Sequence, residues 1–182
     1  MLDQLINLVK EHAGNAINNN PAIPADKKEE AVNVAGSSVA GGLQDMLSKG
    51  GISEVLKMFS GRTDVNDSPV TQHVSSSLTD NLSSKLGIPS AQAGGIAASI
   101  IPSILGSLVN KTNDPNDHSF NIQDIFNQFS GGKTSGMDIG GMLNKFKGGL
   151  DKDGDGDVDL NDLTSMFGSG GGIMDRVKGM FK

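Results

Sequence analysis

Six aspartates in the twelve-residue segment 151–162, DKDGDGDVDLND, are the side chains of this sequence best suited to chemistry. Carboxylate oxygens are the ligands that hard divalent cations prefer, and calcium takes roughly six to eight of them. Three of the aspartates alternate at the first, third and fifth places, so that their oxygens can converge on one ion. We therefore predict a metal site formed by Asp151, Asp153, Asp155, Asp157, Asp159 and Asp162.

The other places of the segment agree with this chemistry. Gly156 is sixth, where the chain must turn sharply and a Cβ atom would obstruct the turn. Asp157 is seventh, where the backbone carbonyl rather than the side chain binds the ion. Asp159, which is ninth, binds directly or through a water molecule, and Asp162 closes the segment. The alternative is a solvated acidic turn that holds no ion.

Apolar residues recur at helical spacing on both sides of the segment. They are Leu143, Phe146 and Leu150 before it, and Leu163, Met166 and Phe167 after it. Together with the loop pattern, residues 138–167 resemble the helix–loop–helix of the EF-hand family. The resemblance implies calcium as the bound ion. It departs at the twelfth place, where the family usually has Glu, because the shorter Asp162 reaches the ion less easily with both oxygens. Discrimination against magnesium is therefore weaker, and magnesium is the alternative ion.

Composition narrows the classes of partner. The net charge is −6, and the six aspartates and Lys152 give the segment 151–162 a charge of −5. The rest of the chain is nearly neutral and has no basic patch, so we expect no nucleic-acid partner. The absence of cysteine excludes disulfides, thiolate metal sites and a cysteine nucleophile. No signal-peptide pattern opens the sequence, and we expect a cytoplasmic protein.

The hydrophobic pattern has helical spacing throughout, which predicts an all-α protein, a compact helical bundle followed by the C-terminal EF-hand. The first predicted helix starts at Leu2 and ends near Gly14, and the second runs from Pro24 to about Ser48. Small residues on the second helix should allow close helix contacts, namely Ala35, Gly36, Ala40 and Gly41. Further helices are predicted at 53–59, 69–86, 90–111 and 122–129, with Ser68 as an N-cap and Gly87 as a stop.

Residues 86–110 carry no charged side chain. Their length would allow a membrane span. Gln92, Pro102 and several Gly and Ser residues dilute the apolar run, however, so we interpret it as a central core helix. The glycine pairs at 41–42, 50–51 and 94–95 do not follow strands, which favours helix contacts or helix stops over phosphate-binding loops.

Three stretches in the first 112 residues are rich in small and apolar residues: LDQLINLVKEH, GGLQDMLSKGGISEVLKMF and LGIPSAQAGGIAASIIPSILGSLVNK. They resemble a bacterial family of unknown function, the YidB-like proteins, which implies a compact helical bundle and supplies no activity. We divide the chain into the YidB-like helical domain (1–112), a connector with a short helix (113–136), the EF-hand (137–168) and a glycine linker with an amphipathic C-terminal helix (169–182).

A second window, 113–124, NDPNDHSFNIQD, begins 38 residues before the first. Pro115 in the third place and His118 in the sixth argue against an ion there. Two interpretations stay open. The window is either a decayed second hand, in which Phe120 pairs with Val158, or an ordinary polar connection in which Asn121 caps the next helix.

No sequence motif points to catalysis. His12, His73 and His118 are far apart in sequence, and His12 and His73 are interpreted as surface residues. No serine-nucleophile, phosphate-loop or zinc-helix motif is present. The leading hypothesis is a calcium-binding, non-enzymatic protein whose helical domain is a structural or interaction module. The alternative is a helical oligomeric or envelope-associated scaffold in which the ion is purely structural. The apolar stripe of 173–181 either docks on the protein itself or binds a protein partner or a second copy, and a membrane-surface role is not expected.

Overall fold

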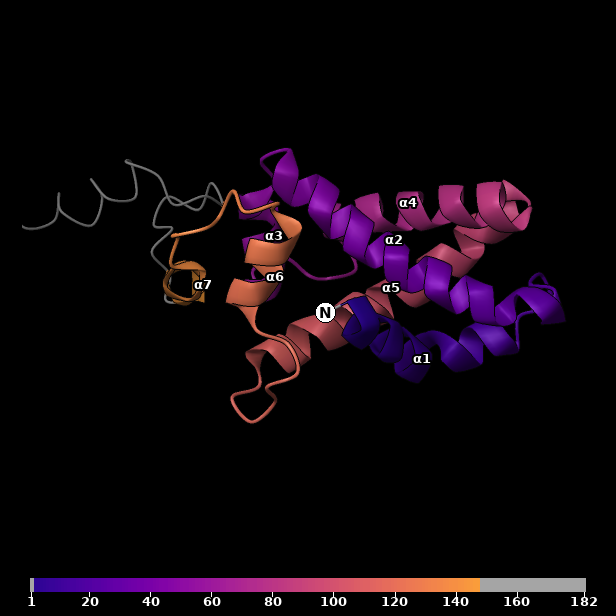
Figure 1. The fold of residues 1–182 in the computed structure, drawn as a ribbon, viewed down its shortest axis with the longest axis horizontal. Helices are drawn as coiled ribbons and strands as arrows, with labels where there is room; N and C mark the ends of the chain where they lie inside the picture. The colour runs from indigo at the N-terminus through magenta and orange to yellow at the C-terminus, as the bar shows by residue number, and fades with distance from the viewer. Residues whose placement is uncertain (1, 148–182) are drawn as a thin grey trace, which may run out of the picture.

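The computed structural model describes residues 2–147, and every regular element in this part of the chain is helical (Figure 1). The elements are α1 (Leu2–Asn18), the 3-10 turn η1 (Ala25–Lys27), α2 (Lys28–Ser48), α3 (Ile52–Ser60), α4 (Pro69–Leu86), α5 (Ser90–Asn113), α6 (Ile122–Phe129) and α7 (Ile139–Lys147). The all-α prediction is confirmed for these residues. The loop and second helix of the predicted EF-hand lie outside the described residues.

Four long helices form the body of the molecule. Helix α1 packs against α2 and α5, and α4 packs against the same two helices from the other side. The short helices α3, α6 and α7 gather at one end of this body (Figure 1). There α7 contacts α3 and α6, while α6 also contacts α2. The last described helix is therefore part of the packed structure.

Helix α5 supplies a long apolar face to the common core. Its buried residues are Ala93, Ile96, Ala97, Ile100, Ile101, Ile104, Leu105, Leu108 and Val109. It is the helix in the described part that is long and apolar enough to cross a membrane by length and composition. Half of its most apolar stretch is nevertheless buried inside the bundle, against α1 and α4. This burial supports the interpretation of 86–110 as a core helix.

Several helix ends follow the predicted capping chemistry. The Ser68 hydroxyl accepts a hydrogen bond from the Val70 N–H (3.2 Å), and Pro69 occupies the first turn of α4. Gly87 ends α4 with φ = 68°, a left-handed conformation that glycine adopts without strain. Gly50 has φ = 97° just after α2. The predicted stops at Gly87 and Gly50 are confirmed.

The predicted end of the first helix near Gly14 is wrong. Helix α1 continues to Asn18, and its last turns bury Ala13 and Ile17 in the core. A glycine inside a helix costs up to about 1 kcal/mol relative to alanine. Full burial of an isoleucine side chain gives back about 1.5–3 kcal/mol, so the helix continues through Gly14.

Close helix contacts occur at two glycines of α2. A Cβ atom on Gly36 would lie 2.8 Å from Ile6 Cγ1 on α1, and one on Gly42 would lie 2.7 Å from Val74 Cγ2 on α4. The predicted contact is thus correct for Gly36 and wrong for Gly41, which is exposed with open space around it. The pair 94–95 lies inside α5, where a Cβ atom added at either glycine would meet no neighbouring element within 4 Å, so it is neither a close contact nor a stop.

Lysine side chains satisfy the carbonyl ends of three helices. Lys27 Nζ donates to the Leu86 carbonyl at the end of α4 (3.0 Å), and Lys133 Nζ donates to the Ser48 carbonyl at the end of α2 (2.7 Å). Lys28 Nζ donates to the Asn18 carbonyl at the end of α1. Each places a positive charge at the negative end of a helix dipole. These contacts also join segments that are distant in sequence.

Candidate functional site

The six predicted metal ligands, Asp151, Asp153, Asp155, Asp157, Asp159 and Asp162, lie outside the described residues, as does the C-terminal helix predicted at 173–181. The structure does describe the helix that leads toward the loop. Helix α7 ends at Lys147, four residues before Asp151. What the structure contributes to this site is therefore the way in which α7 is held.

Helix α7 is anchored through its apolar side. Ile139 is fully buried and Leu143 nearly so, and both belong to the common core. Leu143 thus lies on an apolar face of a helix, as its spacing predicts. The side chain of Phe146 and all of Leu150, the other members of the predicted stripe, lie outside what the structure describes.

Polar contacts fix the N-terminal end of α7. Asp138 Oδ1 accepts a hydrogen bond from the Gly141 N–H (2.8 Å) and acts as an N-cap. Gln123 on α6 forms hydrogen bonds with the residues before and after Asp138. Its Nε2 donates to the Met137 carbonyl and its Oε1 accepts from the Ile139 N–H, each at 3.0 Å. Such hydrogen bonds contribute about 0.5–1.5 kcal/mol each. One side chain thus ties the start of α7 to α6.

A second polar contact lies at the C-terminal end of α7. Lys147 Nζ donates to Asn113 Oδ1 (2.6 Å), and Asn113 Nδ2 donates to the Phe59 carbonyl in the last turn of α3 (2.8 Å). Asn113 is the last residue of α5 and so links three helices at this end. Lys147 and Asn113 Oδ1 meet at the surface, where a hydrogen bond is weaker than in the interior.

The window 113–124 is an ordinary polar connection in its described contacts. Asn121 caps α6 by accepting from the Gln123 N–H (2.8 Å), as one interpretation predicted. Asp114 accepts a hydrogen bond from the Asn116 N–H, and Asp117 accepts from the Ser119 N–H and from Lys111 Nζ on α5. Hydrogen bonds from Ser119 lower the pKa of Asp117 to about 2. The suggested pairing of Phe120 with Val158 cannot be placed, since Val158 lies outside the described residues.

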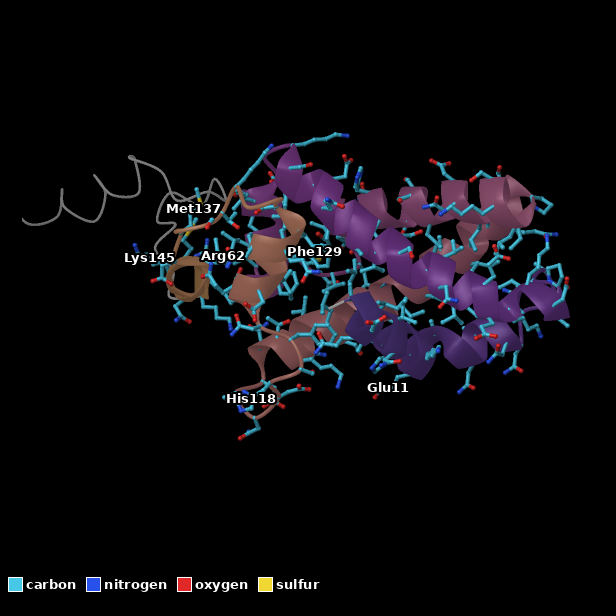
Figure 2. All side chains as sticks on the ribbon, in the orientation of Figure 1. Glu11, Arg62, His118, Phe129, Met137 and Lys145 are labelled. Atoms are coloured by element: carbon cyan, nitrogen blue, oxygen red, sulfur yellow. The ribbon has the colours of Figure 1, made fainter. Side chains whose placement is uncertain are left out.

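The three histidines are not brought together. His12 on α1 has a ring nitrogen 3.0 Å from Ser107 Oγ on α5, and His118 is exposed on the loop after α5 (Figure 2). His73 lies at the surface of α4, as predicted, with 37% of its side chain exposed, and its Nε2 lies 2.8 Å from Asp45 Oδ2 on α2. Among residues 2–147, no three His, Asp or Glu side chains gather as a metal site.

Asp45 and His73 border a polar cleft of about 310 Å³ between α2 and α4. Its lining is polar and includes Gly41, Gly42, Ser76, Ser77, Asp80 and Asn81. A hydrogen bond from Lys49 is the main influence that holds the pKa of the Asp45 carboxyl below its usual value. The contact with His73 lowers this pKa further. Ser76 Oγ donates to the Gln72 carbonyl (3.0 Å), so it is committed to its own helix. The contacts of this cleft join two helices and do not form a nucleophile–base pair.

A scan against family models matches residues 68–180 to the family described as bacterial protein of unknown function (DUF937). The match covers more than half of the chain. The chain belongs to this family. The DUF937 region starts at Ser68, the N-cap of α4, and extends through α7 and the segment 151–162. The match is compatible with the YidB-like resemblance and confirms the expectation of a bacterial domain. Neither the curated proteins nor the solved structures contain a match.

Sequence reasoning missed the residues that hold α7 in this DUF937 protein. Gln123 shares its helix with other polar residues, and no pattern marks it as the one that reaches Met137 and Ile139. Asn113 is the first residue of the predicted polar window 113–124, whereas in the structure it closes α5 and donates to the Phe59 carbonyl. One sequence signal did mark the start of α7: Asp138, a residue type that caps helices, stands directly before Ile139.

Proposed function

We propose that this DUF937 protein binds one calcium ion through the segment 151–162 and that its helical bundle is the structural or interaction module that carries the site. The single observation behind the proposal is the donor set: six aspartates in twelve residues, with Gly156 where the chain must turn. These donors are all oxygens, which fits a hard cation such as calcium, or magnesium in its place, and does not fit a thiophilic metal.

The bundle supports this proposal because it supplies a firm base for the loop. Helix α7 is buried at Ile139 and Leu143 and tied at both ends by side chains of α6 and α5. A loop that follows such a helix loses less conformational freedom when it closes around an ion than a loop in a free chain. When bound, calcium would neutralise the mutual repulsion of the carboxylates.

The second candidate is a helical oligomeric or envelope-associated scaffold in which the ion is purely structural. The observation in its favour is the outer side of α5, where exposed residues such as Ala91, Gly95, Ala98 and Ser99 are small and uncharged. A protein partner or second copy at this surface or at the C-terminal segment belongs to the same proposal. A sensor exposes apolar surface when calcium binds, whereas a structural site resists unfolding. No enzymatic activity is proposed.

Titration calorimetry on the full chain tests the calcium proposal. We expect saturable heat with a stoichiometry of one for the wild type and none for Asp151→Ala, which removes the first ligand. Asp124→Ala is the matched control, because Asp124 is the last residue of the other aspartate-containing window and should leave binding unchanged. Absence of heat in the wild type, or equal binding by Asp151→Ala, contradicts the proposal.

Asp162→Glu should raise the preference for calcium over magnesium. The longer side chain reaches the ion with both oxygens, which suits the larger coordination number of calcium, whereas magnesium demands a compact octahedral shell. We expect the ratio of the two dissociation constants to change by about tenfold, the equivalent of one improved ligand contact of about 1.4 kcal/mol. Competition titrations with both ions measure this ratio. An unchanged or lower preference for calcium would show that Asp162 does not limit the geometry.

A further inference from the structure

Helix α7 is held in place by side chains from helices that precede it in the chain. Gln123 on α6 bonds to the Met137 carbonyl and the Ile139 N–H, on either side of the helix start. Asn113 at the end of α5 bonds to Lys147 at the other end of α7. Between these two ties, the helix rests its apolar side chains on α3 and α6. A tilt or slide of α7 would break a tie and expose buried apolar surface.

We propose that Gln123 and Asn113 are positioning residues for the ion site: they fix α7 before the ion binds, so that calcium stabilises the bundle without moving this helix. The inference rests on the proposed calcium site. Asp151 follows Lys147 by four residues, a chain length that spans at most about 14 Å. The position of Lys147 therefore limits how far the first ligand can lie from α7.

The thermodynamic consequence is a coupling between the ties and the ion. If α7 were loose, part of the binding free energy would be used to order it. The measured affinity would then equal the intrinsic affinity multiplied by the fraction of chains in which α7 is correctly placed. Loss of either tie should therefore weaken calcium binding, although Gln123 and Asn113 lie outside the segment 151–162 that supplies the ligands. By reciprocity, calcium should strengthen the ties.

Gln123 is the better residue to change because it bonds to both sides of the helix start, whereas Asn113 also bonds to the Phe59 carbonyl of α3. Gln123→Met keeps the length of the side chain and removes both hydrogen bonds, while Gln123→Glu retains the acceptor for the Ile139 N–H. Gln128→Met is the matched control, because Gln128 lies exposed on the same helix. All variants are used as full chains, at a temperature well below their melting points.

Calcium titration calorimetry gives the decisive readout. We expect about fivefold weaker binding for Gln123→Met, a smaller loss for Gln123→Glu, and no change for Gln128→Met; fivefold corresponds to about 1 kcal/mol and lies at the lower end of measured site couplings. A merely structural role of Gln123 would lower the melting temperature without changing the dissociation constant. Binding by Gln123→Met within twofold of the wild type overturns the inference, whereas no binding by the wild type overturns the proposed function instead.

Hydrogen exchange on the wild type keeps the inference testable if Gln123→Met does not fold. We expect the amides of 142–147 to be protected already in the presence of a chelator, and any slowing of exchange by calcium to be shared with the other core helices rather than confined to α7. The residues before α7, including Gln123 itself, provide the internal reference. Fast exchange across α7 that becomes slow only with calcium would show that the ion, rather than the bundle, orders this helix.

Discussion

Gly42→Ala should lower the free energy of unfolding by about 1–2 kcal/mol. The added Cβ would lie 2.7 Å from Val74 Cγ2 and 3.2 Å from Val74 Cα, and no rotamer change relieves the second contact. Because α2 and α4 must move apart, we expect the overpacking cost toward the top of the usual range of about 1–3 kcal/mol. This exceeds the gain of up to about 1 kcal/mol from replacing a helical glycine by alanine.

The neighbouring residue provides the control. Gly41→Ala places a Cβ in open space on the same helix, so only the propensity gain remains, and we expect stabilisation by about 0.5–1 kcal/mol. Urea unfolding followed by circular dichroism measures both variants. Equal stabilities of the two would contradict the close crossing of α2 and α4 at Gly42.

Calcium at a hundredfold excess over its dissociation constant should raise the free energy of unfolding by about 2.7 kcal/mol. This follows from mass action, provided that the ion binds the folded chain and that the loop unfolds together with the bundle. The packing of α7 on α3 and α6 supplies that connection. Unfolding curves of the full chain in chelator and in excess calcium measure the difference.

The Asp151→Ala variant separates site binding from general charge screening. It should lose the stabilisation by calcium, whereas Asp124→Ala should keep it. A similar response in all three proteins would mean that calcium acts through its ionic strength alone. A wild-type response close to zero, with calcium bound, would mean that the site folds and unfolds independently of the bundle.

Much of the helical fold could be predicted from local chemistry. Ser68 and Pro69 start α4, Gly87 stops it and Asn121 caps α6, because these residue types satisfy backbone groups that every helix end leaves unpaired. The boundary at Gly14 failed for the opposite reason. The burial of Ile17, which depends on the tertiary structure, outweighs the local preference of glycine.

Contacts between distant segments could not be read from the sequence. Whether Gly41 or Gly42 faces α4 depends on the rotation of α2 about its axis, which the whole core determines. The pairing of His73 with Asp45 and the reach of Gln123 to Met137 and Ile139 likewise depend on how helices meet. The metal ligands, by contrast, are predicted from one continuous segment, since their spacing alone brings the carboxylates together.

The most direct test of the central claim is the number of calcium ions that the intact chain binds, measured by equilibrium dialysis at millimolar free calcium. The account predicts one ion per chain, lost in Asp151→Ala and retained in Asp124→Ala. A value of zero for the wild type contradicts the calcium site. Two ions would contradict the assignment of 113–124 as a polar connection in which Asp114 and Asp117 already accept hydrogen bonds from Asn116, Ser119 and Lys111.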